Sequence, residues 1–214
     1  IYGGLRFYER LEIKNAIAYL KIIFNNNDNP SFERSISNPT RGVGEKTLGK
    51  IRQTAQKYNI SYIKASAKLI DEGSISGRSG SGLRDYLEFV AGCKSFIEEN
   101  SLSDLMELII KESGLYSYHA KEAGEKGKTR TENLEELITA TKNFEQSIRE
   151  EKTNAEIAEN YLDVISLDAG DRQASEHDDA AQLMTMHSAK GLEFKLVLLT
   201  GLEESLFPHG RSME

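Results

Sequence analysis

Two short, mainly apolar runs near the carboxyl end constrain the fold of this chain most strongly. They span 183–186 and 196–200, and the polar turn between them carries His187, Ser188 and Lys190. Apolar runs of this length are typical of parallel strands that are buried on both faces. In open α/β sheets a ligand binds at the carboxyl ends of such strands. The sequence therefore predicts a parallel strand pair with a ligand-facing turn.

The rest of the chain has the periodicity of helices. Apolar residues recur every three or four positions, which is the spacing of a helix with one buried face. We therefore expect a mainly α fold, with a helical domain over 1–167, a charged linker over 168–181 and the short β piece over 182–214. The helical pattern covers 9–24, 58–70, 83–96, 102–110, 131–148 and 155–167, with a short helix before Asn38 and a longer one after Gly44.

Two further segments are rich in turn-forming residues. Segment 71–82, DEGSISGRSGSG, is predicted to be a hinge or a surface loop. Segment 123–130 contains Gly127-Lys128-Thr129, which is similar to the end of a phosphate-binding P-loop. That motif needs a glycine five positions earlier, after a buried strand, and Glu122 stands there in a polar context. We therefore interpret 123–130 as a surface loop and not as a nucleotide site.

The stretch Gly42-Val43-Gly44 joins the two helices around Asn38 and lies directly before the second helix. Glycines allow a ligand to approach the backbone, and the free N–H groups of a first helical turn attract anions. Arg41 and Lys46 add positive charge beside the glycines. The pattern is typical of a helix-hairpin-helix that binds a phosphodiester without reading bases. The alternative is that the glycines only join two helices.

Charge is distributed unevenly along the chain. The net charge is −7, yet residues 1–70 hold 12 Lys and Arg against 5 Asp and Glu, while residues 71–214 hold 15 against 29. Such asymmetry favours a polyanion-binding face at the amino end. Arg10, Lys14 and Lys21 share one face of the first predicted helix and could follow phosphates, or could form an ordinary solvated face.

Metal, disulfide and membrane chemistry are not indicated. The four histidines are far apart in the sequence and have no metal-ligand spacing, so we expect no metal site. The single cysteine, Cys93, lies in an apolar setting and suits a reducing cytoplasm. The chain has no apolar run long enough to span a membrane and no signal peptide. Because it begins with Ile1, we expect it to be a fragment.

Several motifs together resemble the superfamily 1 DNA helicases of the UvrD/PcrA/Rep type. The fifth conserved motif of that family is similar to TMHSAKGLEF at 185–194, followed by GLEESLFP at 201–208. Three further matching stretches are GGLRFYERLEIK at 3–14, NPTRGVG at 38–44 and GEKGKTRTENLEEL at 124–137. The resemblance implies that 1–167 is the helical duplex-binding domain called 2B, and that 182–214 is the fifth-motif part of the RecA-like α/β domain called 2A.

The resemblance also implies roles for individual residues. Thr185 and His187 would face single-stranded DNA, while Gly191 and Glu193 would contact ATP. Duplex phosphates, including those at single-strand/double-strand junctions, would be held by the following residues: Gly42, Val43, Gly44 and Thr47, with Arg41, Lys46, Lys14 and Lys21 as further contacts.

The family's Walker motifs and its other catalytic arginines have no match in this chain. The resemblance therefore implies that a parent enzyme uses ATP and Mg²⁺ to unwind DNA from 3′ to 5′, while this chain binds duplex without hydrolysing ATP and binds no cofactor. It also implies a bacterial, cytoplasmic, nucleoid-associated protein with DNA-repair proteins as further candidate partners. Two alternatives stay open, namely a helical protein-interaction module and a self-sufficient ATPase.

Overall fold

The computed structural model describes residues 7–148, 152–168, 193–194 and 196–199, and all regular secondary structure in these residues is helical. The chain divides into two units, Ile1–Arg172 and Gln173–Glu214. The prediction of a mainly α fold is confirmed. The first unit contains η1 (Phe7–Glu9), α1 (Leu11–Phe24), α2 (Asn29–Ser37), α3 (Glu45–Tyr58), α4 (Tyr62–Asp71), α5 (Gly77–Glu99), α6 (Leu102–Glu112), α7 (Leu115–Ala120), α8 (Glu125–Ser147) and α9 (Asn154–Asp168).

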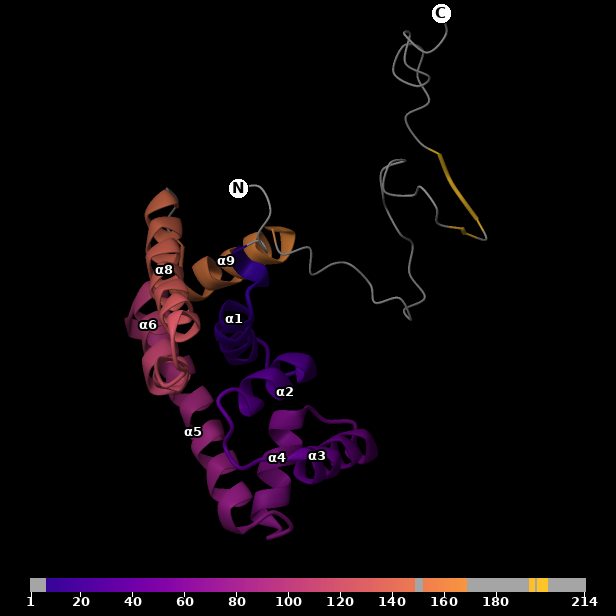
Figure 1. Cartoon of the computed structure of the whole chain (residues 1–214). Helices are drawn as coiled ribbons and strands as arrows, with labels where there is room; N and C mark the ends of the chain where they lie inside the picture. The colour runs from indigo at the N-terminus through magenta and orange to yellow at the C-terminus, as the bar shows by residue number, and fades with distance from the viewer. Residues whose placement is uncertain (1–6, 149–151, 169–192, 195, 200–214) are drawn as a thin grey trace, which may run out of the picture. The chain divides into compact units, whose positions relative to one another are not determined.

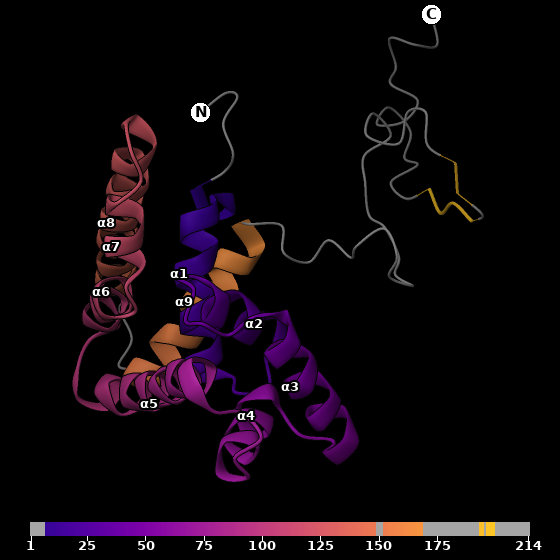
Figure 2. The ribbon, with the colours of Figure 1, turned by 60° about the horizontal axis from the view of Figure 1, so that its bottom comes forward.

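Helix α1 is the central element of the first unit. It contacts α2, α5, α6, α8 and α9, and most of its side chains are buried. A helix that is buried on most of its sides is stable only when other elements surround it. Figures 1 and 2 show how the other helices are arranged. Helices α6 and α8 pack together near one end of α5, and α3 and α4 lie near its other end.

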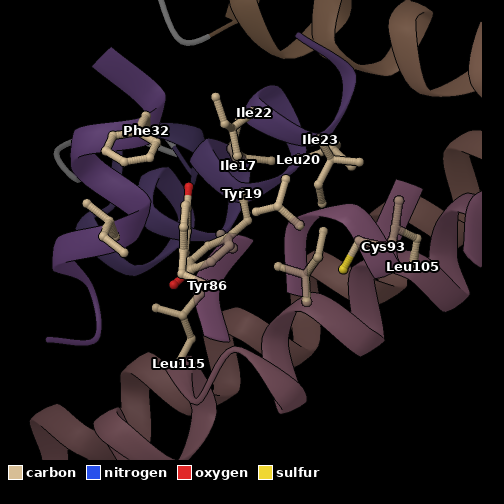
Figure 3. Close-up of a cluster of buried hydrophobic side chains, with 14 of the residues drawn as sticks. Ile17, Tyr19, Leu20, Ile22, Ile23, Phe32, Tyr86, Cys93, Leu105 and Leu115 are labelled. Carbon is tan, nitrogen blue, oxygen red and sulfur yellow. The ribbon is translucent and has the colours of Figure 1, made fainter. Parts of the chain in front are cut away.

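The core beside α1 is rich in aromatic side chains. Tyr19 on α1 and Tyr86 on α5 are both fully buried, and their ring centroids lie 6.1 Å apart. Phe32 of α2 meets Tyr86 edge to face at 5.5 Å. Figure 3 shows these rings within the apolar cluster that also includes Leu105 and Leu115. Because the hydroxyl groups of Tyr19 and Tyr86 are buried, they need polar partners, which the neighbouring loop and α2 supply.

Local sequence explains where several helices begin. Asp28 caps α2 by accepting a hydrogen bond from the Ser31 amide, and Pro30 stands in its first turn. Ser61 caps α4 in the same way. Ser101 caps α6 in a reciprocal capping box with Asp104.

Two predicted loops are helical in the structure. Helix α5 begins at Gly77, so the prediction of a loop through Gly82 is wrong for 77–82. Gly127, Lys128 and Thr129 lie in the first turns of α8 and not in a surface loop. A Cβ at Gly127 would lie only 2.3 Å from the Glu122 carbonyl oxygen, so glycine is needed there for close packing. Turn-forming composition indicated loops in both segments, but tertiary packing stabilises helices in them.

The predicted parallel β piece is not observed. Residues 196–199 have no strand structure, and these residues are 53% to 81% exposed. The physical reason is that a strand needs a neighbour for its backbone N–H and C=O groups, and the described residues contain no strand that could pair with 196–199. The first predicted strand, 183–186, lies outside the described residues, as do Thr200 and most of the predicted linker.

Candidate nucleic-acid interface

A short loop joins α2 to α3 and carries the glycines that the sequence singled out. Gly42 has a φ of +74°, a conformation that other residues rarely adopt. Gly44 is the N-cap of α3 and offers no side chain to its first turn. The Thr47 and Leu48 amides both donate to the Gly44 carbonyl, at 2.9 and 3.0 Å. We call residues 41–47, which are the end of this loop and the first turn of α3, the glycine loop.

The first two amides of α3 have no acceptor among the described residues. They belong to Glu45 and Lys46, and both residues are exposed, as is Gly44. No atom lies within 4 Å of the position that a Cβ on Gly44 would occupy. Unpaired N–H groups at the positive end of a helix attract anions. The glycine loop therefore presents an open, anion-attracting surface.

The first turns of α5 hold the glycine loop in place. The Ser79 hydroxyl donates to the Gly42 carbonyl at 2.6 Å. A Cβ at Gly82 would lie 2.0 Å from the Arg41 carbonyl oxygen, so only glycine lets the loop approach the helix this closely. This contact was missed from the sequence because the Gly- and Ser-rich composition of 77–82 indicated a loop.

The Arg41 side chain is directed into the helical body. Its guanidinium donates to the Tyr19 hydroxyl at 2.8 Å and to the Ser113 carbonyl at 2.9 Å. It also lies over the Tyr19 and Tyr86 rings, 5.8 and 5.7 Å from their centroids. The Arg41 side chain thus fastens the glycine loop to α1, α5 and the residue after α6.

The other cations near the loop differ in their surroundings. Lys46 is exposed beside the open amides, and Thr47 is half-buried next to it. Lys50 donates to the Ser74 carbonyl at 3.1 Å. Arg52 is paired with the Glu33 and Glu45 carboxylates, which raise its pKa further above the ordinary value. Lys46 is therefore the lysine best placed to meet an anion at the first turn of α3.

A second basic surface lies on α1 and α2. Lys14 and Lys21 line a depression of about 100 Å³ together with Arg34, and Lys21 and Arg34 also line a larger neighbouring hollow of about 630 Å³. Two carboxylate residues, Asp28 and Glu33, lie in the larger hollow. The structure thus brings Lys14 and Lys21 together, as the helical spacing predicts.

The predicted contacts of the second unit are largely outside the described residues. This applies to Thr185, His187 and Gly191. Glu193 is described, and it is exposed and lies in no helix or strand.

Metal and cysteine chemistry have no support in the described part of the chain. No group of three or more His, Cys, Asp or Glu side chains there could hold a metal ion. Burial raises the pKa of the Cys93 thiol to about 12, so it remains protonated and packs as a small apolar side chain.

No helix among the described residues is both long and apolar enough to cross a membrane.

Comparison with known proteins identifies relatives over the whole chain. The family model described as "UvrD-like helicase C-terminal domain" matches residues 1–214. DNA helicase II of Escherichia coli (strain K12) is 43% identical over 214 residues, which is 100% of this chain and 29% of that protein. The ATP-dependent DNA helicase PcrA of Bacillus subtilis (strain 168) is 35% identical over 215 residues, again 100% of this chain and 29% of the relative. The chain thus spans less than a third of the length of these relatives.

Proposed function

Because this chain belongs to the family of UvrD-like helicase C-terminal domains, we propose that it is the duplex-binding and regulatory portion of a longer ATP-dependent DNA helicase. That enzyme would move 3′ to 5′ along one strand. The observation that carries the proposal is the open first turn of α3, with its exposed amides at Glu45 and Lys46. A helicase must hold duplex DNA of any sequence, and backbone amides bind phosphates without reading bases.

In this proposal the glycine loop binds the DNA backbone. Amides of Gly42, Val43 and Gly44 and the first turn of α3 approach a phosphate, with Thr47 and Lys46 beside them. Arg41 positions the loop through its bonds to Tyr19 and Ser113.

Lys14 and Lys21 form a further phosphate-binding surface, supported by their shared depression with Arg34. The DNA partners would be duplexes and junctions between single and double strands.

ATP would be the substrate of the longer enzyme, used together with Mg²⁺. Gly191 and Glu193 would contact the nucleotide, while Thr185 and His187 would face single-stranded DNA. Phosphoryl transfer requires a phosphate-binding lysine, a metal site and a transition-state arginine held in one geometry. None of the proposed site residues in this chain fills these roles. We therefore propose that the chain alone binds duplex without hydrolysing ATP.

We further propose that the longer protein acts in the bacterial cytoplasm with repair proteins as partners.

Replacing Gly44 with Asp separates binding from folding. Gly44 has an extended φ of −95° and open space around it, so an Asp there fits and caps α3. The new carboxylate would accept from the open Lys46 amide and repel phosphate from the first turn. We expect Gly44→Asp to leave the free energy of unfolding equal or higher by a few tenths, roughly 0.3 kcal/mol, and to weaken duplex binding steeply in fluorescence anisotropy.

Gly49→Asp is the matched control. It adds the same charge to the same helix at another position with no atom near its Cβ. If both variants weaken binding equally, net charge and not the glycine loop governs affinity.

If the unmodified chain shows no duplex affinity that falls with rising salt, the duplex-binding proposal is wrong, and binding to a repair protein or to the helicase core becomes the better account. Measurable ATP turnover by the chain would overturn the proposed lack of hydrolysis.

A further inference from the structure

The Arg78 side chain lies across the glycine loop from the neighbouring helix. Arg78 stands in the first turn of α5 and is exposed. An ideal Cβ on Gly42 would lie 3.0 Å from Arg78 Cγ and 3.3 Å from Arg78 Nε. The next residue, Ser79, donates its hydroxyl to the Gly42 carbonyl at 2.6 Å. The stem of Arg78 therefore rests on the Gly42 backbone, and the absence of a Gly42 side chain leaves room for it.

The guanidinium of Arg78 has no hydrogen-bond or ion-pair partner among the residues that the structure describes. Other arginines close to the loop are engaged. Arg41 is bonded to Tyr19 and Ser113, and Arg52 is paired with two carboxylates. An unpaired guanidinium with five donors is well suited to bind a phosphate at two points.

The open amides of α3 lie close to the Gly42 backbone that the Arg78 side chain crosses. Gly42 and Gly44 are two residues apart, so their Cα atoms are separated by at most about 7 Å. A phosphate at the first turn of α3 would thus lie close to a side chain that crosses Gly42. Amides and a guanidinium on two different helices would then face the same region of solvent.

We propose that Arg78 binds the DNA backbone together with the glycine loop, as a contact from α5 that completes the duplex interface. This inference rests on the proposed duplex-binding function. It gives α5 two roles, because Ser79 and Gly82 hold the loop while Arg78 contributes charge to its surface.

The test uses the whole 214-residue chain and a short labelled duplex, with anisotropy measured over a series of salt concentrations. Arg78→Met keeps an unbranched stem against Gly42 but removes the charge, and Arg78→Lys keeps a charge. Arg84→Met is the matched control, since Arg84 is an exposed arginine on another face of α5. Thermal unfolding of each variant is recorded alongside.

We expect Arg78→Met to weaken binding about fivefold at low salt, the upper range for an exposed charge pair. The slope of log affinity against log salt should become shallower by about one ion, because one phosphate contact is lost. Arg78→Lys should retain most of the affinity and Arg84→Met all of it. Unchanged thermal midpoints should accompany these results.

Two outcomes would overturn the inference while the proposed function stands. In the first, the unmodified chain binds duplex with a steep salt dependence, but Arg78→Met behaves like Arg84→Met. In the second, the affinity of Arg78→Met falls only together with its thermal midpoint, which would make Arg78 a packing residue of the loop. A chain without salt-dependent duplex affinity would overturn both proposals.

Discussion

Arg41 is a half-buried cation that is stabilised without a carboxylate partner among the described residues. Its guanidinium is bonded to the Tyr19 hydroxyl and the Ser113 carbonyl, and two aromatic faces lie against it. Burial raises the pKa of the Tyr19 and Tyr86 hydroxyls, so both stay neutral near neutral pH. Arg41 therefore pairs with neutral acceptors, and the attachment of the glycine loop does not depend on the ionisation of an acid.

Gly82 provides a prediction at the scale of one methyl group. The Arg41 carbonyl oxygen would lie 2.0 Å from a Cβ at this position, and it is a backbone atom that cannot rotate away. We expect Gly82→Ala to destabilise the chain by about 1–3 kcal/mol through this overlap. Urea unfolding followed by circular dichroism measures the change.

Gly92→Ala on the same helix is the control for Gly82→Ala. Gly92 is exposed, and no atom lies within 4 Å of its Cβ position. The same substitution should there stabilise α5 by up to about 1 kcal/mol, because alanine favours a helix. Equal effects of the two substitutions would mean that the loop does not press against Gly82.

At the scale of elements, α6 is capped twice. Ser101 and Asp104 form a capping box within the local sequence. In addition, the Glu145 carboxylate on α8 accepts from the amides of Leu102 and Ser103, at 2.5 and 3.1 Å. A carboxylate at the positive end of a helix is favourable. Helices α6 and α8 are thus joined by a polar contact as well as by their apolar faces.

We expect Glu145→Ala to destabilise the chain by about 1–2 kcal/mol, because it removes the carboxylate that accepts hydrogen bonds from the Leu102 and Ser103 amides. The free energy of unfolding in urea gives the measurement. Glu132→Ala removes an exposed carboxylate from the same helix and should change stability by less than about 0.5 kcal/mol. A Glu145 variant as stable as the Glu132 variant would show that the capping box alone is sufficient for α6.

At the scale of the whole molecule, a polar network joins α1, α7 and α8. Arg130 on α8 contacts Glu122 at 2.6 Å and the buried Glu12 of α1 at 3.6 Å. The buried His119 of α7 lies 2.7 Å from the same Glu122 carboxylate, through Nδ1. The Asn133 amide donates to Glu12 at 2.6 Å. These bonds join helices that are distant in the sequence, so their loss should affect the unit as a whole.

The network predicts acid sensitivity. The hydrogen bond from His119, followed by the bond and charge of Arg130, lowers the pKa of Glu122 below its ordinary value of 4.5. A lowered folded-state pKa stabilises the chain above the unfolded-state pKa, and this stability is lost as pH falls through the folded value. We expect the thermal midpoint of unfolding to decrease as the pH is lowered below about 4.5. Glu122→Gln should make this decrease smaller.

Glu125→Gln is the control for the acid profile, because Glu125 is an exposed carboxylate three residues after Glu122, at the start of α8. Its profile should follow that of the unmodified chain. If Glu122→Gln also follows it, Glu122 does not contribute to the acid response.

Much of the helical unit and the location of its anion-attracting loop could be predicted from the sequence. Apolar periodicity locates α1, α3 and α6 to within a few residues, because one buried face repeats every three or four positions. The glycines at 42 and 44 mark the loop for a local reason, since only backbone freedom and an uncapped helix start are needed. The family resemblance through the conserved motifs is likewise confirmed by the comparisons.

Only the tertiary structure decided which side chains serve the loop and which hold the fold. Arg41 and Arg78 are both arginines beside glycines in the sequence, yet one is bonded inside the helical body and the other is exposed without a partner among the described residues. The start of α5 is a helix and 196–199 is not a strand because regular structure depends on the contacts that surround it. Sequence patterns report local preference, whereas long-range packing and hydrogen bonding determine the partner of each group.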